Sequence, residues 1–85
     1  MLAIDIERDI RKFLVDTFLF GRAEDLNRDQ SLLRRVIDST GVLELVVFLQ
    51  DHFGITVADE DVVPENFDSV KSVVAYVAQK LENKS

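Results

Sequence analysis

The sequence contains no cysteine among its 85 residues, and its one histidine is His52. Without cysteine the chain cannot form a disulfide, use a thiolate nucleophile or bind zinc through sulfur. One histidine excludes a metal site built from several imidazoles, and a Ser–His–Asp triad would have to use His52. The residue types thus offer little support for an enzyme with its own nucleophile and base.

Basic residues are fewer than acidic ones. The 10 lysines and arginines against 16 aspartates and glutamates give a formal net charge of −6 at pH 7. This balance argues against nucleic acid and anionic membranes as partners, because both demand a basic surface, and it favours a basic protein partner. Residues 1–11 mix acids and bases and no long apolar run follows. We therefore expect neither a signal peptide nor a membrane span, and a cytoplasmic monomer.

Glycine and proline are also scarce, at three residues and one, so few turns are signalled and helices are favoured. Residues that are apolar, with the exception of Thr17, recur at the spacing of one helix face in three stretches. These are Ile6, Ile10, Phe13, Leu14 and Thr17; Val42, Leu45, Val46, Leu49 and Phe53; and Val70, Val73, Val74, Val77 and Leu81. The pattern predicts an all-α fold and a single domain over residues 1–85. We expect a small antiparallel bundle of three long helices and one short one.

Side-chain oxygens and glycines predict the helix ends. The expected caps are Asp5 or Asp9 for the first helix, Asp38 or Ser39 for the second, and Asp68 for the last. Gly21 and Gly54 stand just past the ends of the first and second helices. Residues 82–85 are expected to fray.

Two connections remain. Residues 22–38 are predicted to be a long loop without structure of its own, whose apolar residues, Leu32, Leu33, Val36 and Ile37, lie across the core. Residues 55–57 could form an isolated strand, but no second strand is available to pair with them. We expect instead a loop that leads into one helical turn at Asp59–Val63, stopped by Pro64.

The dipeptide Asp38-Ser39, at the start of the second helix, has two compatible interpretations. The serine is a helix N-cap, or its hydroxyl carries a phosphodiester, an anion that a helix N-terminus stabilises. The surrounding run Val36-Ile37-Asp38-Ser39-Thr40-Gly41-Val42-Leu43-Glu44-Leu45-Val46 resembles the modification site of acyl carrier proteins and of their peptidyl and aminoacyl relatives. The resemblance continues through Leu49-Gln50-Asp51-His52-Phe53-Gly54-Ile55, Asp59-Glu60-Asp61 and Phe67-Asp68-Ser69-Val70, and covers residues 5–82.

This resemblance implies that a separate transferase adds a 4′-phosphopantetheine arm from coenzyme A to Ser39, with Asp38 assisting at the transferase's magnesium site. The thiol of the arm then carries an acyl or aminoacyl group as a thioester, so the chain itself is not an enzyme. Fatty-acid carriers usually have leucine after the serine and acidic residues before the motif. This chain has Thr40-Gly41 and Arg34-Arg35 at those places. It is therefore more similar to stand-alone carriers that serve an adenylating ligase, such as the D-alanine carrier type. The implied partners are the transferase and either such a ligase or acyl-chain enzymes.

The second helix also predicts a docking surface. With Val42 at the centre of the core stripe, Leu43 and Val47 fall at roughly 100° and 140° around the helix. Asp51 and Glu44 follow at roughly 180° and 200°. Single exposed apolar residues are normal, but two flanked by acids form a patch of the kind that binds a partner. The recognition helix of the family coincides with this patch, so Leu43, Glu44, Val47 and Asp51 are carried over as recognition residues.

Other candidates have a structural interpretation. His52 lies where a cation complements the helix dipole. Asp59-Glu60-Asp61 lacks the spaced ligands of a calcium loop and is expected to be a solvated turn. The six phenylalanines are expected to fill the core rather than to contact a cofactor. Hence we expect the cargo to stay outside, with the arm along Leu43 and Val47. The competing hypothesis is a noncatalytic helical interaction module in which Ser39 is only a cap.

Overall fold

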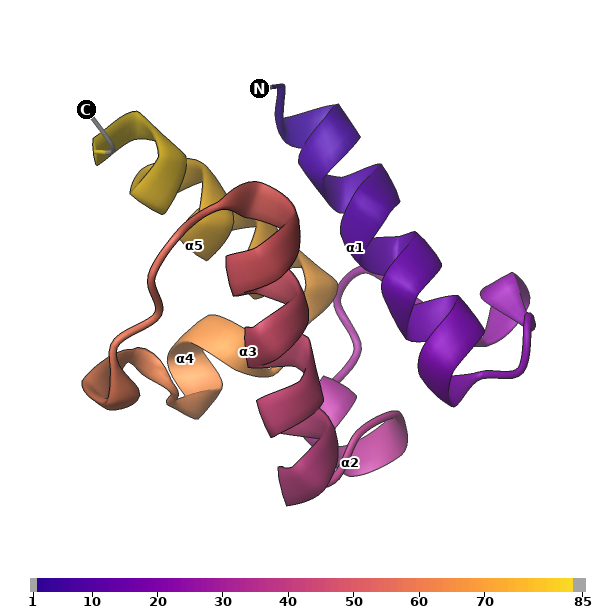
Figure 1. Ribbon diagram of the computed structural model, residues 1–85. Coiled ribbons are helices and arrows are strands. Elements are labelled where there is room, and N and C mark those ends of the chain that lie inside the picture. The colour runs from indigo at the N-terminus through magenta and orange to yellow at the C-terminus, as the bar shows by residue number, and fades with distance from the viewer. Residues whose placement is uncertain (1, 84–85) are drawn as a thin grey trace.

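The computed structural model describes residues 2–83, in which five α-helices and no strands occur (Figure 1). The three long helices are α1 (Ala3–Phe18), α3 (Ser39–Phe53) and α5 (Val70–Asn83). The short ones are α2 (Leu32–Arg35) and α4 (Pro64–Phe67), and two 3₁₀ turns, η1 (Ala23–Asp25) and η2 (Asp59–Asp61), precede them. The prediction of a small all-α bundle is confirmed.

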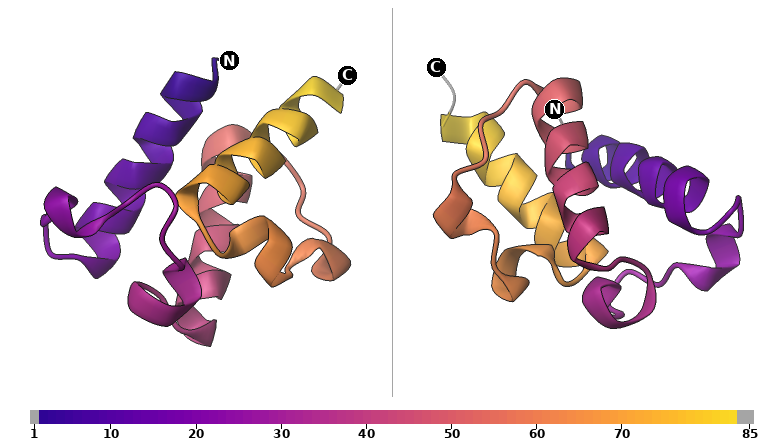
Figure 2. Two further views of the ribbon diagram at one scale, coloured as in Figure 1. Left: turned by 180° about the vertical axis from the view of Figure 1, so that it is seen from behind. Right: turned by 60° about the horizontal axis from the view of Figure 1, so that its bottom comes forward.

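The first long helix runs opposite to the other two. Figures 1 and 2 show α1 descending from the N-terminus, while α3 and α5 both run back toward the end of the molecule where the two termini lie. The core between them consists of fully buried side chains: Ile6, Ile10 and Leu14 of α1, Leu45 and Leu49 of α3, and Val70, Val73 and Val77 of α5. Because α3 runs toward the end where the two termini lie, it begins at the opposite end of the bundle (Figure 1).

The expected structureless connection over residues 22–38 is wrong, because it contains η1 and α2. Its apolar residues do cover the core: Leu26, Leu32 and Ile37 are buried. Pro64 also does more than stop a helical turn. It stands at the first position of α4, where its missing N–H is not needed.

Two predicted caps are wrong. No side chain caps α1, which begins after Leu2, and Asp5 lies inside its first turn. Asp68 does not cap α5, since the hydroxyl oxygen of Ser69 accepts the backbone N–H of Ser72 at 3.0 Å instead. The predicted glycines are correct, because Gly21 and Gly54 follow α1 and α3 at φ values of +85° and +68°.

Asp68 instead joins the connection over residues 22–38 to the start of α5 through hydrogen bonds. Its carboxylate accepts the Ser31 hydroxyl at 2.6 Å and the Leu33 backbone N–H at 3.0 Å. Its carbonyl oxygen accepts the Leu32 N–H at 2.6 Å. The hydrogen bond from Ser31, followed by that from Leu33, lowers the pKa of the Asp68 carboxyl below its ordinary value of 3.8. The segment that contains α2 and leads toward α3 is therefore hydrogen-bonded to the residues just before α5.

The last helix is longer than expected. Glu82 and Asn83, predicted to fray, belong to α5, while residues 84–85 lie outside the described part of the chain. Among residues 2–83, no helix has both the length and the apolar character that crossing a membrane requires.

Candidate attachment site and docking surface

Ser39 is the first residue of α3, and it is exposed. The cap of the helix is Asp38, whose carboxylate oxygen Oδ1 accepts the Gly41 N–H at 2.8 Å. Within residues 2–83 the Ser39 hydroxyl has no hydrogen-bond partner. The sequence left the cap open between these two residues, and the structure assigns it to Asp38. The serine hydroxyl is consequently free for chemistry with an incoming group.

The backbone around Ser39 is fixed by close packing. Ile37 is buried, and Gly41 leaves no space for a side chain. A Cβ atom on Gly41 would lie 2.9 Å from Cβ of Ile37 and 3.1 Å from Cε1 of Phe18. A depression of about 490 Å³ adjoins this contact and is lined by Phe18, Val36, Asp38, Thr40, Gly41 and Glu44. The serine thus projects from the first turn of a helix whose backbone is closely packed against Ile37 and Phe18.

All four predicted recognition residues lie on the surface of α3. Leu43 and Val47 are 64% and 54% exposed, and Glu44 and Asp51 are exposed as well. Neither carboxylate has a salt-bridge partner in the described part of the chain. Their role in recognition stays a prediction, but the structure presents them together.

The buried stripe of α3 is not centred on Val42, as the sequence predicts, but slightly to one side of it. Gly41, Leu45, Leu49 and Phe53 are the buried residues of α3, whereas Val42 and Val46 are half-buried. The shift turns α3 so that the side bearing Phe48 faces α1.

Three rings stack at that contact and form what we call the ring column: Phe13, Phe48 and His52. Phe13 of α1 stacks on Phe48 with ring centroids 4.3 Å apart, and Phe48 stacks on His52 at 4.9 Å. Sequence reasoning missed this column, although Phe48 and His52 stand four residues apart and therefore share one face of the helix.

His52 lies at the predicted end of α3, and it has a partner that the sequence does not predict. It lies in the last turn of α3, and its Nε2 atom is 3.0 Å from Oδ2 of Asp9. This hydrogen bond is the main reason that the pKa of Asp9 is below its ordinary value of 3.8. Asp9, predicted as a possible cap, instead connects α1 to α3.

The acidic turn at Asp59–Asp61 also has a structural function. The carboxylate of Asp61 accepts the hydroxyl of Tyr76 at 2.8 Å. Burial, followed by this bond, raises the pKa of Tyr76 from 10.0 to about 12. Within residues 2–83 no three histidine, aspartate or glutamate side chains lie close enough together to hold a metal ion.

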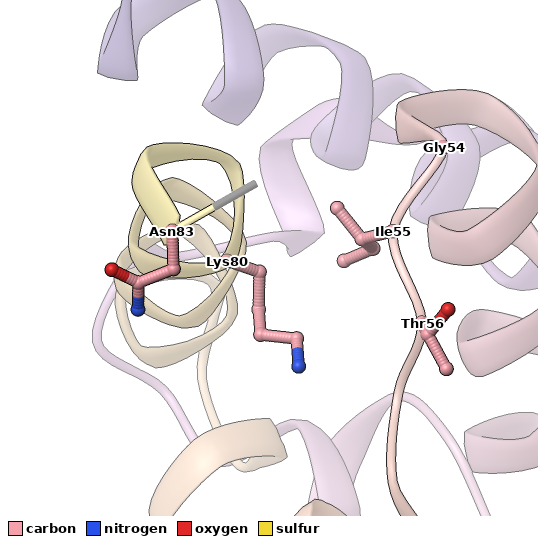
Figure 3. Close-up of a pocket in the computed structure, with 5 residues that line it drawn as sticks. All are labelled: Gly54, Ile55, Thr56, Lys80 and Asn83. Carbon is pink, nitrogen blue, oxygen red and sulfur yellow. The ribbon is translucent and has the colours of Figure 1, made fainter. Parts of the chain in front are cut away.

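A depression of about 300 Å³ at the other end of the bundle is lined by Gly54, Ile55, Thr56, Lys80 and Asn83. Figure 3 shows Lys80 extending from α5 into the space before Thr56, while Asn83 points away from that segment. Its lining holds one cation and no carboxylate, histidine or cysteine. It borders the residues that follow the C-terminal end of α3, whereas Ser39 begins that helix.

The comparison with known proteins agrees with the family resemblance of the residues around Ser39. No family model matches the chain. A curated protein from Serratia sp., described as the probable acyl carrier protein PigG, is 27% identical to it over 73 residues. The match covers 85% of this chain and 84% of that protein.

Proposed function

We propose that this chain, which belongs to the acyl carrier protein family, bears a 4′-phosphopantetheine arm on Ser39 and presents an acyl or aminoacyl thioester to partner enzymes. The observation that carries the proposal is the exposed Ser39 hydroxyl, which has no hydrogen-bond partner within residues 2–83, on a helix already capped by Asp38. A serine that served only as a cap would use its oxygen for the backbone. Here that oxygen is left available to a transferase.

The residues present fit the group. A phosphodiester on Ser39 would lie at the N-terminus of α3, where free N–H groups and the helix dipole favour an anion. Asp38 would flank the same position and, by family resemblance, assist at the transferase's magnesium site. The arm would supply the reactive thiol that a chain without cysteine lacks. Tethering raises the effective concentration of the cargo at each partner.

The test is the intact mass of the chain after incubation with coenzyme A and a broad-specificity phosphopantetheinyl transferase. The wild-type chain should gain the mass of one arm, and Ser39→Ala should gain none. Ser72→Ala is the matched control, because Ser72 is a serine near the start of α5 that hydrogen-bonds with Ser69. It should be modified like the wild type. A wild-type chain that gains no mass would support the competing hypothesis of a helical interaction module.

Partner enzymes are proposed to dock on Leu43, Glu44, Val47 and Asp51. Glu44→Lys and Asp51→Lys should slow modification by the transferase, and the loss should shrink at high salt because it is electrostatic. Val47→Asp should slow it with less dependence on salt, since it removes an apolar contact. Unchanged rates in all three variants would exclude this face.

The cargo is proposed to stay outside the bundle. The apolar cavity lined by Leu33, Val42, Val62, Val63, Pro64 and Phe67 measures about 90 Å³. A space of this size does not hold a long acyl chain, which could enter only by separating packed side chains. Loading a short and a long acyl group should therefore shift amide signals near Ser39 and along α3 only. Large shifts at the buried Val74 and Val77 with the long chain would show that the core opens.

A further inference from the structure

Two shallow depressions follow the ring column along the junction of α1 and α3, and all three rings line both. The larger, about 420 Å³, is completed by Glu44, Val47 and Asp51. The smaller, about 260 Å³, is completed by Asp9, Lys12, Asp16 and Thr17. Because they share the column, they form one groove that joins the docking surface of α3 to α1.

The groove has more carboxylates than cations to pair with them. On the α1 side Lys12 is paired with Asp16 at 3.0 Å, and Asp9 offsets any charge on His52 at 3.0 Å. On the α3 side, Glu44 and Asp51 have no ion-pair partner within residues 2–83. The larger depression therefore lacks a cation to match these two acids.

The order of side chains along α3 defines what fits there. Glu44, Val47, Phe48 and Asp51 follow the spacing of one helix face, so the two acids stand about 10 Å apart along the axis. Val47 and the ring of Phe48 lie between them, and Phe13 adds a second ring from α1. This surface suits a cation that is flat, weakly hydrated and carried on an apolar stem.

An arginine side chain has these properties, and lysine does not. The planar guanidinium stacks on aromatic faces and pairs with a carboxylate through two parallel hydrogen bonds. The ammonium of lysine is compact and strongly hydrated, so it loses more on leaving water. The combination of ring surface with flanking carboxylates thus favours arginine.

We propose that this groove receives an arginine side chain of the partner enzyme, stacked on Phe48 and Phe13 and paired with Glu44 or Asp51. The inference rests on the proposed carrier function, since that function supplies the partner. It goes further in extending the docking surface from α3 onto α1 and in naming the group that fills its centre.

The test titrates the full chain, labelled with ¹⁵N, with N-acetyl-arginine methylamide and separately with N-acetyl-lysine methylamide. The arginine probe should cause saturating shifts at Phe13, Val47 and Phe48, at least about twofold larger than those of the lysine probe, because guanidinium stacks better on rings. Equal shifts from the two probes, or no saturating shift, would overturn the proposal.

Two paired variants separate the groove from general attraction to an acidic protein. Glu44→Gln/Asp51→Asn and Asp59→Asn/Glu60→Gln both raise the net charge from −6 to −4. The first should abolish the shifts, and the second, in the exposed residues of η2, should leave them intact. The same loss in both would mean attraction by net charge alone and would refute a built site.

Phe48→Leu keeps an apolar side chain but removes the ring, and it should erase the preference for arginine. Native shifts at the buried Val73 and Val77 would confirm that the variant is folded. If it does not fold, Phe13→Leu tests the other ring of the same stack. The mass gain at Ser39 is an independent readout. A modified chain without arginine preference overturns this inference alone, whereas a chain that is never modified overturns the carrier function.

Discussion

Gly41 offers a test in which the ordinary rule for helices and the packing of this fold predict opposite signs. Gly41 lies inside α3, and replacing glycine by alanine inside a helix usually stabilises a protein by about 0.5–1 kcal/mol. In this chain the new methyl group would lie 2.9 Å from Cβ of Ile37 and 3.1 Å from the ring of Phe18. Cβ of Ile37 is fixed directly to the backbone, so the clash cannot be relieved by rotating a side chain.

The two effects determine the expected magnitude. Overpacking of a well-packed site typically costs about 1–3 kcal/mol. Subtracting the gain in helix propensity leaves a net loss of up to about 2.5 kcal/mol for Gly41→Ala, with about 1 kcal/mol as the central expectation. In a domain of this size, 1 kcal/mol lowers the melting temperature by about 4–8 °C.

The measurement is urea unfolding of Gly41→Ala and of Thr40→Ala, which changes an exposed neighbour in the same helical turn. Thr40→Ala should remain within about 0.5 kcal/mol of the wild type, because it touches no packed group. We also expect Gly41→Ala to slow modification of Ser39, since a shift of Ile37 displaces the two residues that follow it. A Gly41→Ala variant more stable than the wild type would refute the packing argument.

Three further predictions concern single groups. Asp38→Ala should lower the free energy of unfolding by about 0.5–2 kcal/mol in urea titrations, and Asp38→Asn by much less, because asparagine caps equally well. The lowered pKa of Asp68 adds stability that is present above its unfolded value of 3.8 and is lost as pH falls below it. Asp68→Asn should therefore reduce the fall in melting temperature between pH 5 and about pH 3. The pKa of Tyr76, raised from 10.0 to about 12, adds stability that is present below pH 10.0 and lost as pH rises toward 12. Tyr76→Phe should melt at more nearly equal temperatures at about pH 9 and pH 11, and an unchanged alkaline loss would contradict the bond to Asp61.

The three long helices could be predicted because each buries a stripe that recurs at the helix period, such as Val70, Val73, Val74 and Val77. The short helices could not, since a four-residue segment such as α2 has no period to detect. Its order comes from hydrogen bonds to Asp68, which stands 36 residues after Leu32 in the sequence. The same remote contacts explain the wrong cap. A carboxylate before a helix indicates a cap only when no other donor competes for it, and Ser31 and Leu33 do.

The candidate site divides in the same way between local and remote information. Ser39 could be found because the motif and the predicted helix start coincide within a few residues, and Leu43 and Val47 because a helical wheel separates them from the core. The ring column could not, because the partners of Phe48 and His52 are Phe13 and Asp9, which α1 contributes from far along the chain. Packing against α1 turns Phe48 from a core side chain into one wall of a surface groove. A groove of this kind is formed where two helices meet, so it can be recognised only once the angle between those helices is known.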